Sequence, residues 1–437
     1  MKRFVLYGMA VLGLLSSCAE ENGPSPEDSV FAFDVPKIEQ TQEYPVGVFY
    51  INVGSNGQDA ARYSRLQEKF DPANGRLGFD LDLTLGNYGV DQDPAKVTDL
   101  MVENIQQEVD WCIAGGVDFW ILPAIKAKKN AVAPDCLEGD NRLYDIIRGT
   151  VGSDVAGSGK HVDMKQLKFV ATINVEDPLC QDKWETYNED GTLTGGKTGK
   201  LSNTVLLNER DDICSWVNGR GYKRSEMFVE FIKSCDKFFK DEHYYRVDGR
   251  PMVVLQNAHK LYTSDCAGFW EYLRSAVLEA TGEEPFFVGQ MDPWTPPARY
   301  QYFFTGLDAV AAKNMYNNSD WTRYQYYPQT IYLNFEYCLK YFRDNMGGID
   351  FIPTGAPAWN KWIDNQETDK PLMQHDPDTW RETLNILKGN AGQRKIVFID
   401  SFNQIQYGSF IAPTKEDYGN GYGTLYLDII KDEMDVN

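Results

Sequence analysis

Short apolar runs recur along the chain and alternate with longer stretches of helical periodicity. Eight runs rich in Val, Ile, Leu and Phe predict buried strands, over residues 46–52, 116–122, 168–176, 252–256, 285–291, 307–316, 348–356 and 395–402. Apolar residues three and four positions apart predict amphipathic helices over residues 97–114, 227–239, 330–342 and 379–387. Alternating strands and helices indicate a parallel sheet. Eight such units predict closure into a (β/α)8 barrel, the TIM-barrel form of the α/β class.

A doubly wound open sheet is the alternative arrangement of the same elements. Such sheets usually carry a glycine-rich phosphate loop after the first strand. Here residues 53–57 (VGSNG) follow the first strand and lack the G-x-G-x-x-G spacing. The sequence therefore favours the barrel, and it predicts neither a dinucleotide site nor any other cofactor.

Long polar segments separate the first four strands. They cover residues 58–88, 126–160 and 177–221. Each follows the carboxyl end of a strand, so all three are expected at the C-terminal rim of the barrel. Loops of this length in a compact domain are usually functional or frayed. Their grouping over one mouth predicts a cleft for an extended ligand.

The charge and the aromatic content narrow the class of ligand. The formal net charge of −21 argues against nucleic acid, whose phosphates require clustered Lys and Arg, and against docking on anionic lipid. The 10 Trp and 25 Tyr supply many flat amphipathic rings, which in soluble acidic proteins often stack on sugars. Packing in the core is the alternative explanation for most of these rings.

The N-terminus has the pattern of an exported lipoprotein. Lys2 and Arg3 precede an apolar segment over residues 4–15 that is too short to span a bilayer. Residues 15–18 (LSSC) resemble a bacterial lipobox, which implies lipidation of Cys18; an ordinary cleaved signal with a chance cysteine is the alternative. The predicted organisation is a signal peptide over 1–17, an acidic Pro-containing tether over 18–43 and the barrel over 44–437.

The residues after Cys18 predict where the protein is anchored. Ala19 stands where an Asp would be associated with retention in the inner membrane, and Glu20 and Glu21 resemble an acidic export signal of surface lipoproteins. We therefore expect a lipid anchor in the outer membrane, at the cell surface of a Gram-negative bacterium.

Seven cysteines remain after Cys18, and none forms a C-x-x-C pair. With only 4 histidines, widely scattered, the sequence predicts no zinc or other metal site. Disulfides are compatible with an extracellular location, and Cys136, Cys180 and Cys214 are the best candidates because they lie in loop-like contexts. Cys112 and Cys235 lie in helical patterns and are expected to be buried thiols.

Five phrases carry a family resemblance. They are residues 46–50 (VGVFY), 85–88 (LGNY), 114–120 (AGGVDFW), 244–251 (YYRVDGRP) and 402–408 (FNQIQYG). In this order and spacing they resemble the glycoside hydrolase family 71/99-like barrels, which include the WbsX-like polysaccharide-cluster proteins once labelled as glycosyltransferases. The resemblance covers about residues 44–430. It implies a TIM barrel that acts on glycans.

The last phrase departs from the family pattern where catalysis is expected. In family 99 members two glutamates of this motif act as base on the sugar 2-hydroxyl and as acid/base on the glycosidic oxygen. The resemblance places Gln404 and Tyr407 at these positions. An amide does not accept a proton at neutral pH, and a phenol with a pKa near ~10 is a poor general acid here. The family mechanism therefore does not transfer unchanged.

Three strand-end carboxylates are the candidates to replace the missing pair. Glu176 ends the third strand, where relatives place a substrate-binding glutamate, and Asp292 and Asp400 follow the fifth and eighth strands. A glycosidase needs two such groups across one cavity, about 5–10 Å apart. Each has an alternative role in a salt bridge or turn. Asp118, inside the second strand, is expected to be structural.

Amides and tryptophans near the strand ends are the predicted binding residues. Amides offer donors and acceptors without charge, which suits neutral polyols, and tryptophan faces stack on pyranose rings. The predicted substrate-binding residues are Asn52, Asn314, Trp294, Trp321, Trp359, Asn403, Gln404 and Tyr407, with Gln256 and Asn360 also near strand ends. Core placement is the alternative for each tryptophan.

These features predict a surface lipoprotein that acts on glycans, as a glycoside hydrolase that cleaves α-linked polysaccharide. A catalytically inactive barrel that binds glycans at the cell surface is the alternative, because both family glutamates are replaced. The expected partners are a polysaccharide or oligosaccharide and the membrane, through Cys18. An extracytoplasmic protein scaffold is a third reading, without specific support in the sequence.

Overall fold

The computed structural model divides the chain into two units, Met1–Val35 and Pro36–Asn437. The description below concerns the second. The structure describes residues 30–51, 81–85, 98–128, 131–137, 142–147, 161–175, 184–198, 205–206, 213–262, 265–291, 304–313, 326–359 and 373–435.

The centre of the second unit is a ring of parallel strands. In ring order the strands are β1 (Val46–Phe49), β2 (Phe119–Ala124), β3 (Lys168–Asn174), β10 (Arg250–Gln256), β12 (Phe286–Met291), β13 (Ala309–Ala312), β14 (Asp350–Ile352), β15 (Thr354–Gly355) and β16 (Val397–Ile399). Strand β1 pairs with both β2 and β16, so the first and last strands meet. The predicted α/β barrel is confirmed.

Pro353 explains why the ring contains two short strands in place of one. β14 pairs with β13, β15 pairs with β16, and only this proline separates β14 from β15. Proline has no backbone N–H to donate to a ladder, but its carbonyl accepts from Phe398 N at 2.9 Å. β14 and β15 are therefore one interrupted strand, and each of the eight predicted strands has its counterpart in the ring.

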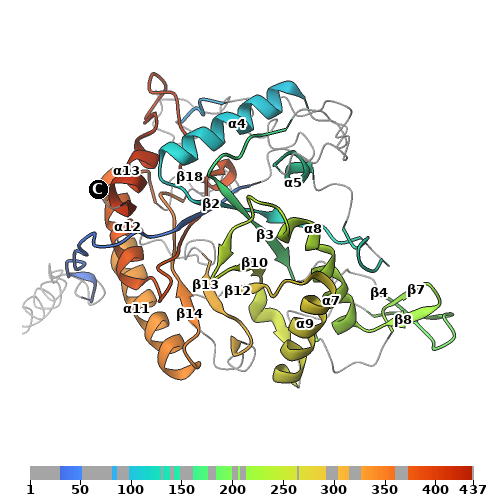
Figure 1. The fold of residues 1–437 in the computed structure, drawn as a ribbon. Helices are drawn as coiled ribbons and strands as arrows, with labels where there is room; N and C mark the ends of the chain where they lie inside the picture. Colours follow the sequence, from blue (N-terminus) through green and yellow to red (C-terminus); the bar gives the residue numbers. More distant parts are fainter. Residues whose placement is uncertain are drawn as a thin grey trace, which may run out of the picture. The chain divides into compact units, whose positions relative to one another are not determined.

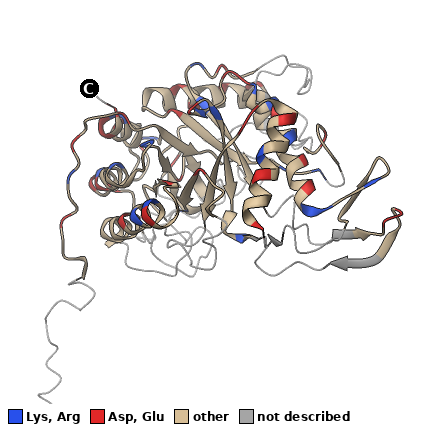
Figure 2. Ribbon diagram, turned by 60° about the horizontal axis from the view of Figure 1, so that its bottom comes forward, with Lys and Arg blue, Asp and Glu red and all other residues tan. Residues whose placement is uncertain are grey.

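Helices surround the ring (Figure 1). They are α4 (Asp99–Ala114), α5 (Arg142–Ile147), α7 (Arg224–Ser234), α8 (Asp236–Phe239), α9 (Cys266–Thr281), α11 (Tyr327–Asn345), α12 (Pro377–Asn390) and α13 (Leu425–Met434). The four predicted helices are present, with the second divided between α7 and α8 at Cys235. Figure 2 shows charged residues mainly on the helices and loops, while the strands are mostly uncharged. This distribution is expected when strands are buried on both faces.

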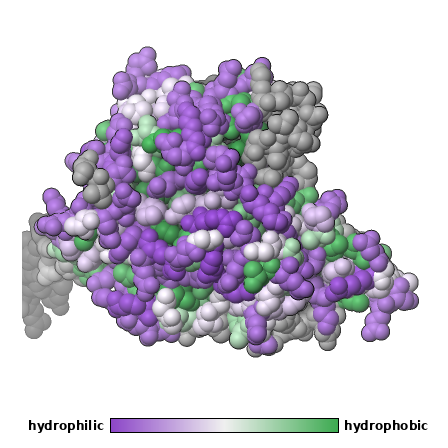
Figure 3. Space-filling view, in the orientation of Figure 1, coloured by the Kyte–Doolittle hydropathy of each residue, from purple (hydrophilic) through white to green (hydrophobic). Residues whose placement is uncertain are grey.

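Alternate strand residues fill the interior of the barrel. The inward set is almost entirely apolar and includes Phe49, Ile121, Val254, Val288 and Phe398, all at most 7% exposed. Near the amino ends of the strands, the short β9 (Arg246–Val247) pairs with β10, and the Tyr245 ring stacks on Phe119 with centroids 3.9 Å apart. Hydrophilic residues cover most of the surface seen in Figure 3, with hydrophobic residues in small groups.

The predicted loops contain more structure than expected. The third, over residues 177–221, includes two antiparallel hairpins, β4 (Trp184–Tyr187) with β5 (Leu193–Thr198), and β7 (Ser215–Val217) with β8 (Arg220–Tyr222). The second contains α5, and most of the first lies outside the described residues. The loop interpretation was wrong for the hairpins because their strands are short and polar.

Residues before β1 are fastened to the barrel. Ile38 N donates to Asn385 Oδ1 at 2.8 Å, Asn385 Nδ2 donates to Pro36 O at 2.8 Å, and Gln40 Nε2 donates to Met434 O at 2.6 Å. Residues from Pro36 onward therefore contact the helices α12 and α13. No helix in the described ranges is long and apolar enough to cross a membrane.

No disulfide is formed by the cysteines in the described ranges. Cys136 and Cys214 are buried thiols, so the structure does not show the disulfides predicted for them. Cys180, the third candidate, lies outside the described residues. Cys112 and Cys235 are buried thiols as predicted, and burial raises the pKa of each thiol above its usual value.

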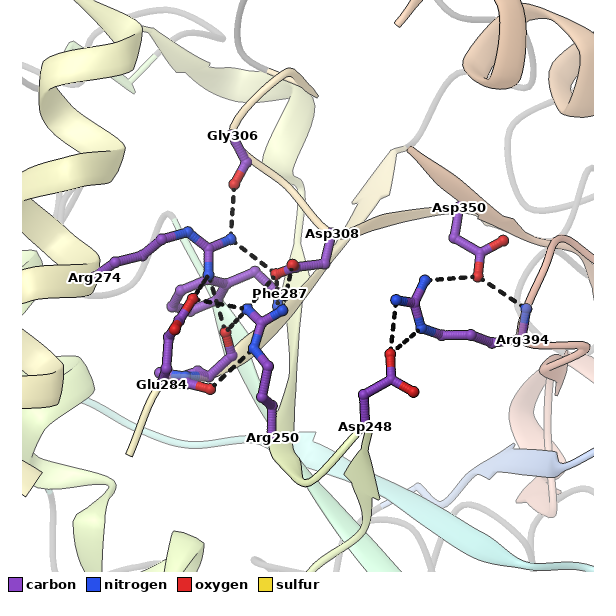
Figure 4. Close-up of polar contacts among 10 residues, drawn as sticks. Asp248, Arg250, Arg274, Glu284, Phe287, Gly306, Asp308, Asp350 and Arg394 are labelled. Atoms are coloured by element: carbon purple, nitrogen blue, oxygen red, sulfur yellow. Dashed lines mark hydrogen bonds and ion pairs between the residues drawn. The ribbon is translucent and has the colours of Figure 1, made fainter. Parts of the chain in front are cut away.

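Ion pairs join the amino ends of the strands (Figure 4). Asp308, just before β13, accepts from Arg250 at 2.7 and 3.0 Å, from Arg274 at 2.8 Å and from Phe287 N at 2.9 Å. Burial alone would raise the pKa of Asp308, but hydrogen bonds from Arg250 and the charge of Arg274 hold the pKa below its ordinary value.

A second network ties β14 to the segment before β16. Both Asp350 carboxylate oxygens accept backbone N–H groups, from Gln393 at 2.7 Å and from Arg394 at 3.1 Å. The Arg394 side chain donates to Asp350 at 3.2 Å and to Asp248 at 2.8 Å (Figure 4). Together the two networks connect the strands of half the ring at their amino ends.

Candidate functional site

Polar side chains continue the inward alternation beyond the apolar core. On β10 and β12 the core residues Val254 and Val288 are followed, two positions later, by Gln256 and Gln290. Because strand side chains alternate with a period of two, the later residues face inward too. The same step on four other strands completes the set, called the polar ring here: Thr172, Gln256, Gln290, Lys313, Thr354 and Asp400. The polar ring lies at the carboxyl ends of the strands, the end that carries active sites in barrels of this form.

Three members of the polar ring have buried atoms without a partner. Thr172 and Thr354 are 0% exposed and Gln290 is 4% exposed. Within the described part of the chain, no hydrogen bond reaches Thr172 Oγ1, Gln290 Oε1 or Thr354 Oγ1. A buried polar atom left unpaired costs about 1–3 kcal/mol. Such atoms gathered at one end of a barrel are suited to bind the hydroxyls or amides of a ligand.

Asp400 provides an ionisable group in the polar ring. It directly follows β16, and its backbone N–H donates to Gly355 O at 2.9 Å. Burial raises the pKa of Asp400 to about 6, with the positive charge of Lys313 acting in the opposite direction. Its negative charge contributes to raising the pKa of Tyr327, after burial of that phenol. Asp400 keeps part of its surface exposed. A carboxyl with a pKa near neutrality can both give and take a proton.

The chain after Asp400 folds into a small hairpin. It consists of β17 (Asn403–Gln404), η7 (Ile405–Tyr407) and β18 (Ser409–Phe410). Ser401, fully buried, fastens the base of the hairpin: its Oγ donates to Ser409 O and accepts from Gln404 N, both at 2.8 Å.

Asn403 ties this hairpin to the end of β1. Its Oδ1 accepts from Ile51 N at 2.7 Å. Its Nδ2 is buried and, among the described residues, donates to no acceptor. Asn403 therefore fixes the hairpin and retains one amide hydrogen-bond donor for a ligand.

Trp359 and Tyr407 form a stacked pair between the loops after the seventh and eighth strands. Their ring centroids are 4.6 Å apart with an interplanar angle of 17°. Trp359 is only 1% exposed, whereas Tyr407 is partly exposed. The burial of Trp359 against Tyr407 corresponds to the alternative of core placement, and a role of Trp359 in binding stays a prediction.

The structure brings five of the predicted site residues together at one end of the barrel: Asp400, Asn403, Gln404, Tyr407 and Trp359. The others lie outside the described residues: Glu176, Asp292, Asn52, Asn314, Trp294, Trp321, Asn360 and the lipidation candidate Cys18. Gln256, named from its place near a strand end, belongs to the polar ring. Asp118 accepts from Val46 N at 2.7 Å at the amino end of β2, which is a structural role.

The sequence interpretation missed four polar-ring residues: Thr172, Gln290, Lys313 and Thr354. A signal for them existed, because each lies two positions after an apolar residue in a predicted strand. Counting in steps of two from that residue would have found them. Among the residues with described positions, no cluster of three or more His, Cys, Asp and Glu could hold a metal ion.

The site thus belongs to a closed parallel α/β barrel with a polar mouth, and comparison with known proteins agrees with this class. Residues 217–430 match the family model described as "Glycosyltransferase WbsX". This segment runs from β7 into α13 and includes Asp400 and the hairpin.

Two solved structures match most of the chain. One, described as a glycoside hydrolase-like protein, matches with a TM-score of 0.65 and 21% identity, covering 94% of this chain and 99% of the other. Another, a GH99 endo-alpha-mannosidase from Bacteroides thetaiotaomicron, matches with a TM-score of 0.47 and 12% identity, covering 88% of this chain and 94% of the other. No protein with curated annotation matches the chain.

Proposed function

We propose that the protein acts on glycans at the carboxyl end of the barrel, as a glycoside hydrolase that cleaves α-linked polysaccharide. The observation that carries the proposal is Asp400, a carboxyl with a pKa of about 6 beside buried polar atoms that lack partners. Such a carboxyl suits proton transfer to a glycosidic oxygen. The match to a glycosyltransferase-named family and the likeness to a glycoside hydrolase-like barrel support the same substrate class.

The second carboxyl of the reaction is proposed from the sequence. Glycoside hydrolysis requires two carboxyl groups in most families. Gln404 and Tyr407, at the family positions, supply neither. In the sequence, Glu176 is two positions after the last residue of β3 and Asp292 directly follows β12, and we propose one of these two residues as the second carboxyl.

Glycan binding without hydrolysis is the second candidate function. The stacked pair of Trp359 and Tyr407 favours it, because an aromatic ring occupies a position that holds a catalytic glutamate in the related family. In this case Asp400 accepts hydrogen bonds from sugar hydroxyls and transfers no proton.

A panel of α-linked oligosaccharides tests both candidates with the purified protein. Hydrolysis predicts reducing-sugar release that Asp400→Asn abolishes, while Asp118→Asn, at the opposite end of the barrel, retains it. Binding without hydrolysis predicts that glycans retard the wild type in affinity electrophoresis and that neither the wild type nor any variant releases reducing sugar. The double variant Gln404→Glu with Tyr407→Glu tests whether restoring both family carboxyls creates or raises activity. A wild-type protein that neither binds nor cleaves any member of the panel would contradict the proposed function.

We also propose that Cys18 is lipidated and anchors the protein in the outer membrane, facing the cell exterior. The support is the basic, apolar and lipobox pattern of residues 2–18 and the acidic residues that follow. Labelling with a fatty-acid analogue should mark the wild type and not Cys18→Ala. External protease should remove the protein from intact cells, and protection from protease would contradict surface display.

A further inference from the structure

We infer that Tyr407 is the stacking platform for a sugar ring in this site, and that Trp359 is the positioning residue that holds the platform from behind. The inference rests on the proposed glycan ligand. Tyr407 would then bind the ligand through its ring, at a position where the related family uses a carboxylate.

The two rings differ in their access to solvent. In the stacked pair, at 4.6 Å and 17°, Trp359 is the buried partner and Tyr407 the partly exposed one. Of this pair, only Tyr407 keeps an appreciable surface in contact with solvent, so a ligand that reaches the pair would contact the tyrosine. An aromatic face binds the C–H face of a pyranose by dispersion and burial of apolar area, and it needs no charge to do so.

The platform is held from two loops. Trp359 forms a bridge with Met373, in which each backbone N–H donates to the other carbonyl, at 2.9 and 3.0 Å. Tyr407 ends the turn η7, which closes with a hydrogen bond from Gly408 N to Ile405 O at 3.0 Å and with Gly408 at a φ of 62°. A ring fixed before the ligand arrives loses little conformational freedom on binding.

The hairpin also brings the platform close to groups that bind polar atoms. Ser401, next to Asp400, is bonded through its backbone N–H and its Oγ to Ser409 O, two residues after Tyr407. Asn403, on the same hairpin, keeps an unpartnered buried Nδ2. A flat apolar face beside amide and carboxyl groups fits a pyranose, which has an apolar face and a rim of hydroxyls.

The experiment measures affinity for the oligosaccharide that the panel identifies, by calorimetry on the full chain. Tyr407→Ala should weaken binding about tenfold or more, because it removes the platform. Tyr407→Phe keeps the ring and should bind within about twofold of the wild type. If the protein is a hydrolase, Tyr407→Ala should raise KM more than it lowers kcat.

A matched control comes from a second stacked tyrosine. Tyr337 is 51% exposed and stacks on Tyr341 on the outer helix α11, with centroids 5.9 Å apart. Tyr337→Ala should leave affinity unchanged. Trp359→Ala removes the support but keeps the Tyr407 ring, so it should weaken binding, and by less than Tyr407→Ala. Unfolding curves for each variant ensure that only folded protein is compared.

The outcomes separate this inference from the proposed function. Equal affinity of Tyr407→Ala and the wild type would overturn the platform and leave glycan action intact. Equal losses in Tyr407→Ala and Tyr407→Phe would also overturn it, because the hydroxyl rather than the ring would then bind the ligand. Absence of any glycan binding by the wild type would overturn the proposed function and this inference with it.

Discussion

The two ends of the barrel differ in whether their buried polar groups have hydrogen-bond partners. At the amino end, Asp308 and Asp350 receive hydrogen bonds from arginines and backbone N–H groups (Figure 4). At the carboxyl end, Thr172, Gln290 and Thr354 keep buried atoms that no described residue satisfies. The amino end has the features of a structural closure, and the carboxyl end has those of a site prepared for a ligand.

Two aspartates have pKa values shifted in opposite directions. Despite burial, Asp308 has a pKa held below its ordinary value by Arg250 and Arg274. Asp400, near one lysine, has a pKa raised by burial to about 6. Ionised Asp308 therefore stabilises the fold, whereas ionised Asp400 destabilises it. The raised pKa alone does not distinguish the two ends, because burial also raises the pKa of Asp118, at the amino end, to about 6. What distinguishes Asp400 is its place among buried polar atoms without partners in the described part of the chain.

Removing the Asp400 carboxyl should have the largest effect on function. Asp400→Asn is expected to lower kcat by about 10²–10⁴-fold if the group transfers a proton. The amide has nearly the same shape, so the fold should be retained. Initial rates on the cleaved oligosaccharide measure the effect. A rate within a few-fold of the wild type would contradict a catalytic role for Asp400. The polar ring would then be a binding surface only.

Removing the Asp308 carboxyl should have the largest effect on stability. Asp308→Ala leaves the guanidinium groups of Arg250 and Arg274 without their shared partner and should lower the free energy of unfolding by about 3 kcal/mol. Chemical denaturation at pH 7 measures the loss. Asp344→Asn, which removes an exposed pair with Arg343, is the control and should have no measurable effect. Unchanged stability of Asp308→Ala would contradict the view of the amino end as a structural closure.

The two aspartates should also give opposite pH dependences of stability. The folded-state pKa of Asp400 is above the ordinary value of 3.8, so this group lowers stability as pH rises from about 4 to 6. The loss is at most about 3 kcal/mol, and is reduced by the remaining solvent contact. Asp308, with a lowered pKa, contributes stability that is lost as pH falls through its folded-state pKa.

The contribution of Asp400 to the pH dependence of stability is measured by comparing the wild type with Asp400→Asn. The free energy of unfolding of Asp400→Asn minus that of the wild type should be near zero at pH 4 and positive at pH 8. A difference that is constant across this range would show that Asp400 titrates with an ordinary pKa.

Replacing Thr354, whose hydroxyl has no described partner, should give the smallest effect. An atom kept for a ligand is recognised when its removal raises stability and weakens binding. Thr354→Val removes an unsatisfied hydroxyl and should raise the free energy of unfolding by about 1 kcal/mol while weakening glycan affinity. Thr383→Val is the matched control, because Thr383 is equally buried but its hydroxyl donates to Thr379 O at 2.8 Å. The control should lose stability and keep affinity. Lower stability in both variants would show that Thr354 has a partner in solution.

Much of the fold could be predicted from the sequence. Some elements that were not predicted nevertheless have clear signals in it. The helix α9 was missed although Asp265 and Gly282 mark its two ends: Asp265 accepts from Gly268 N, and Gly282 has a φ of 77°. The strand around Pro353 was found as one element, but its division between two ladders depends on how its neighbours pair.

The candidate site was predictable in location but not in detail. Strand ends and the family phrase led to Asp400, Asn403 and Tyr407. Which ring covers which, as in the stack of Trp359 and Tyr407, depends on two loops that are distant in sequence and meet only after the barrel has closed.

The sequence by itself determined the strand–helix alternation and the closed parallel barrel, because burial on both faces requires continuous apolar runs that can be read locally. It also determined which strand residues face inward, since that depends only on a period of two. Only the tertiary structure decided which polar groups are satisfied. The pairing of Asp308, the raised pKa of Asp400 and the unpartnered atoms of the polar ring all depend on distances between strands, and no local pattern in the chain encodes those distances.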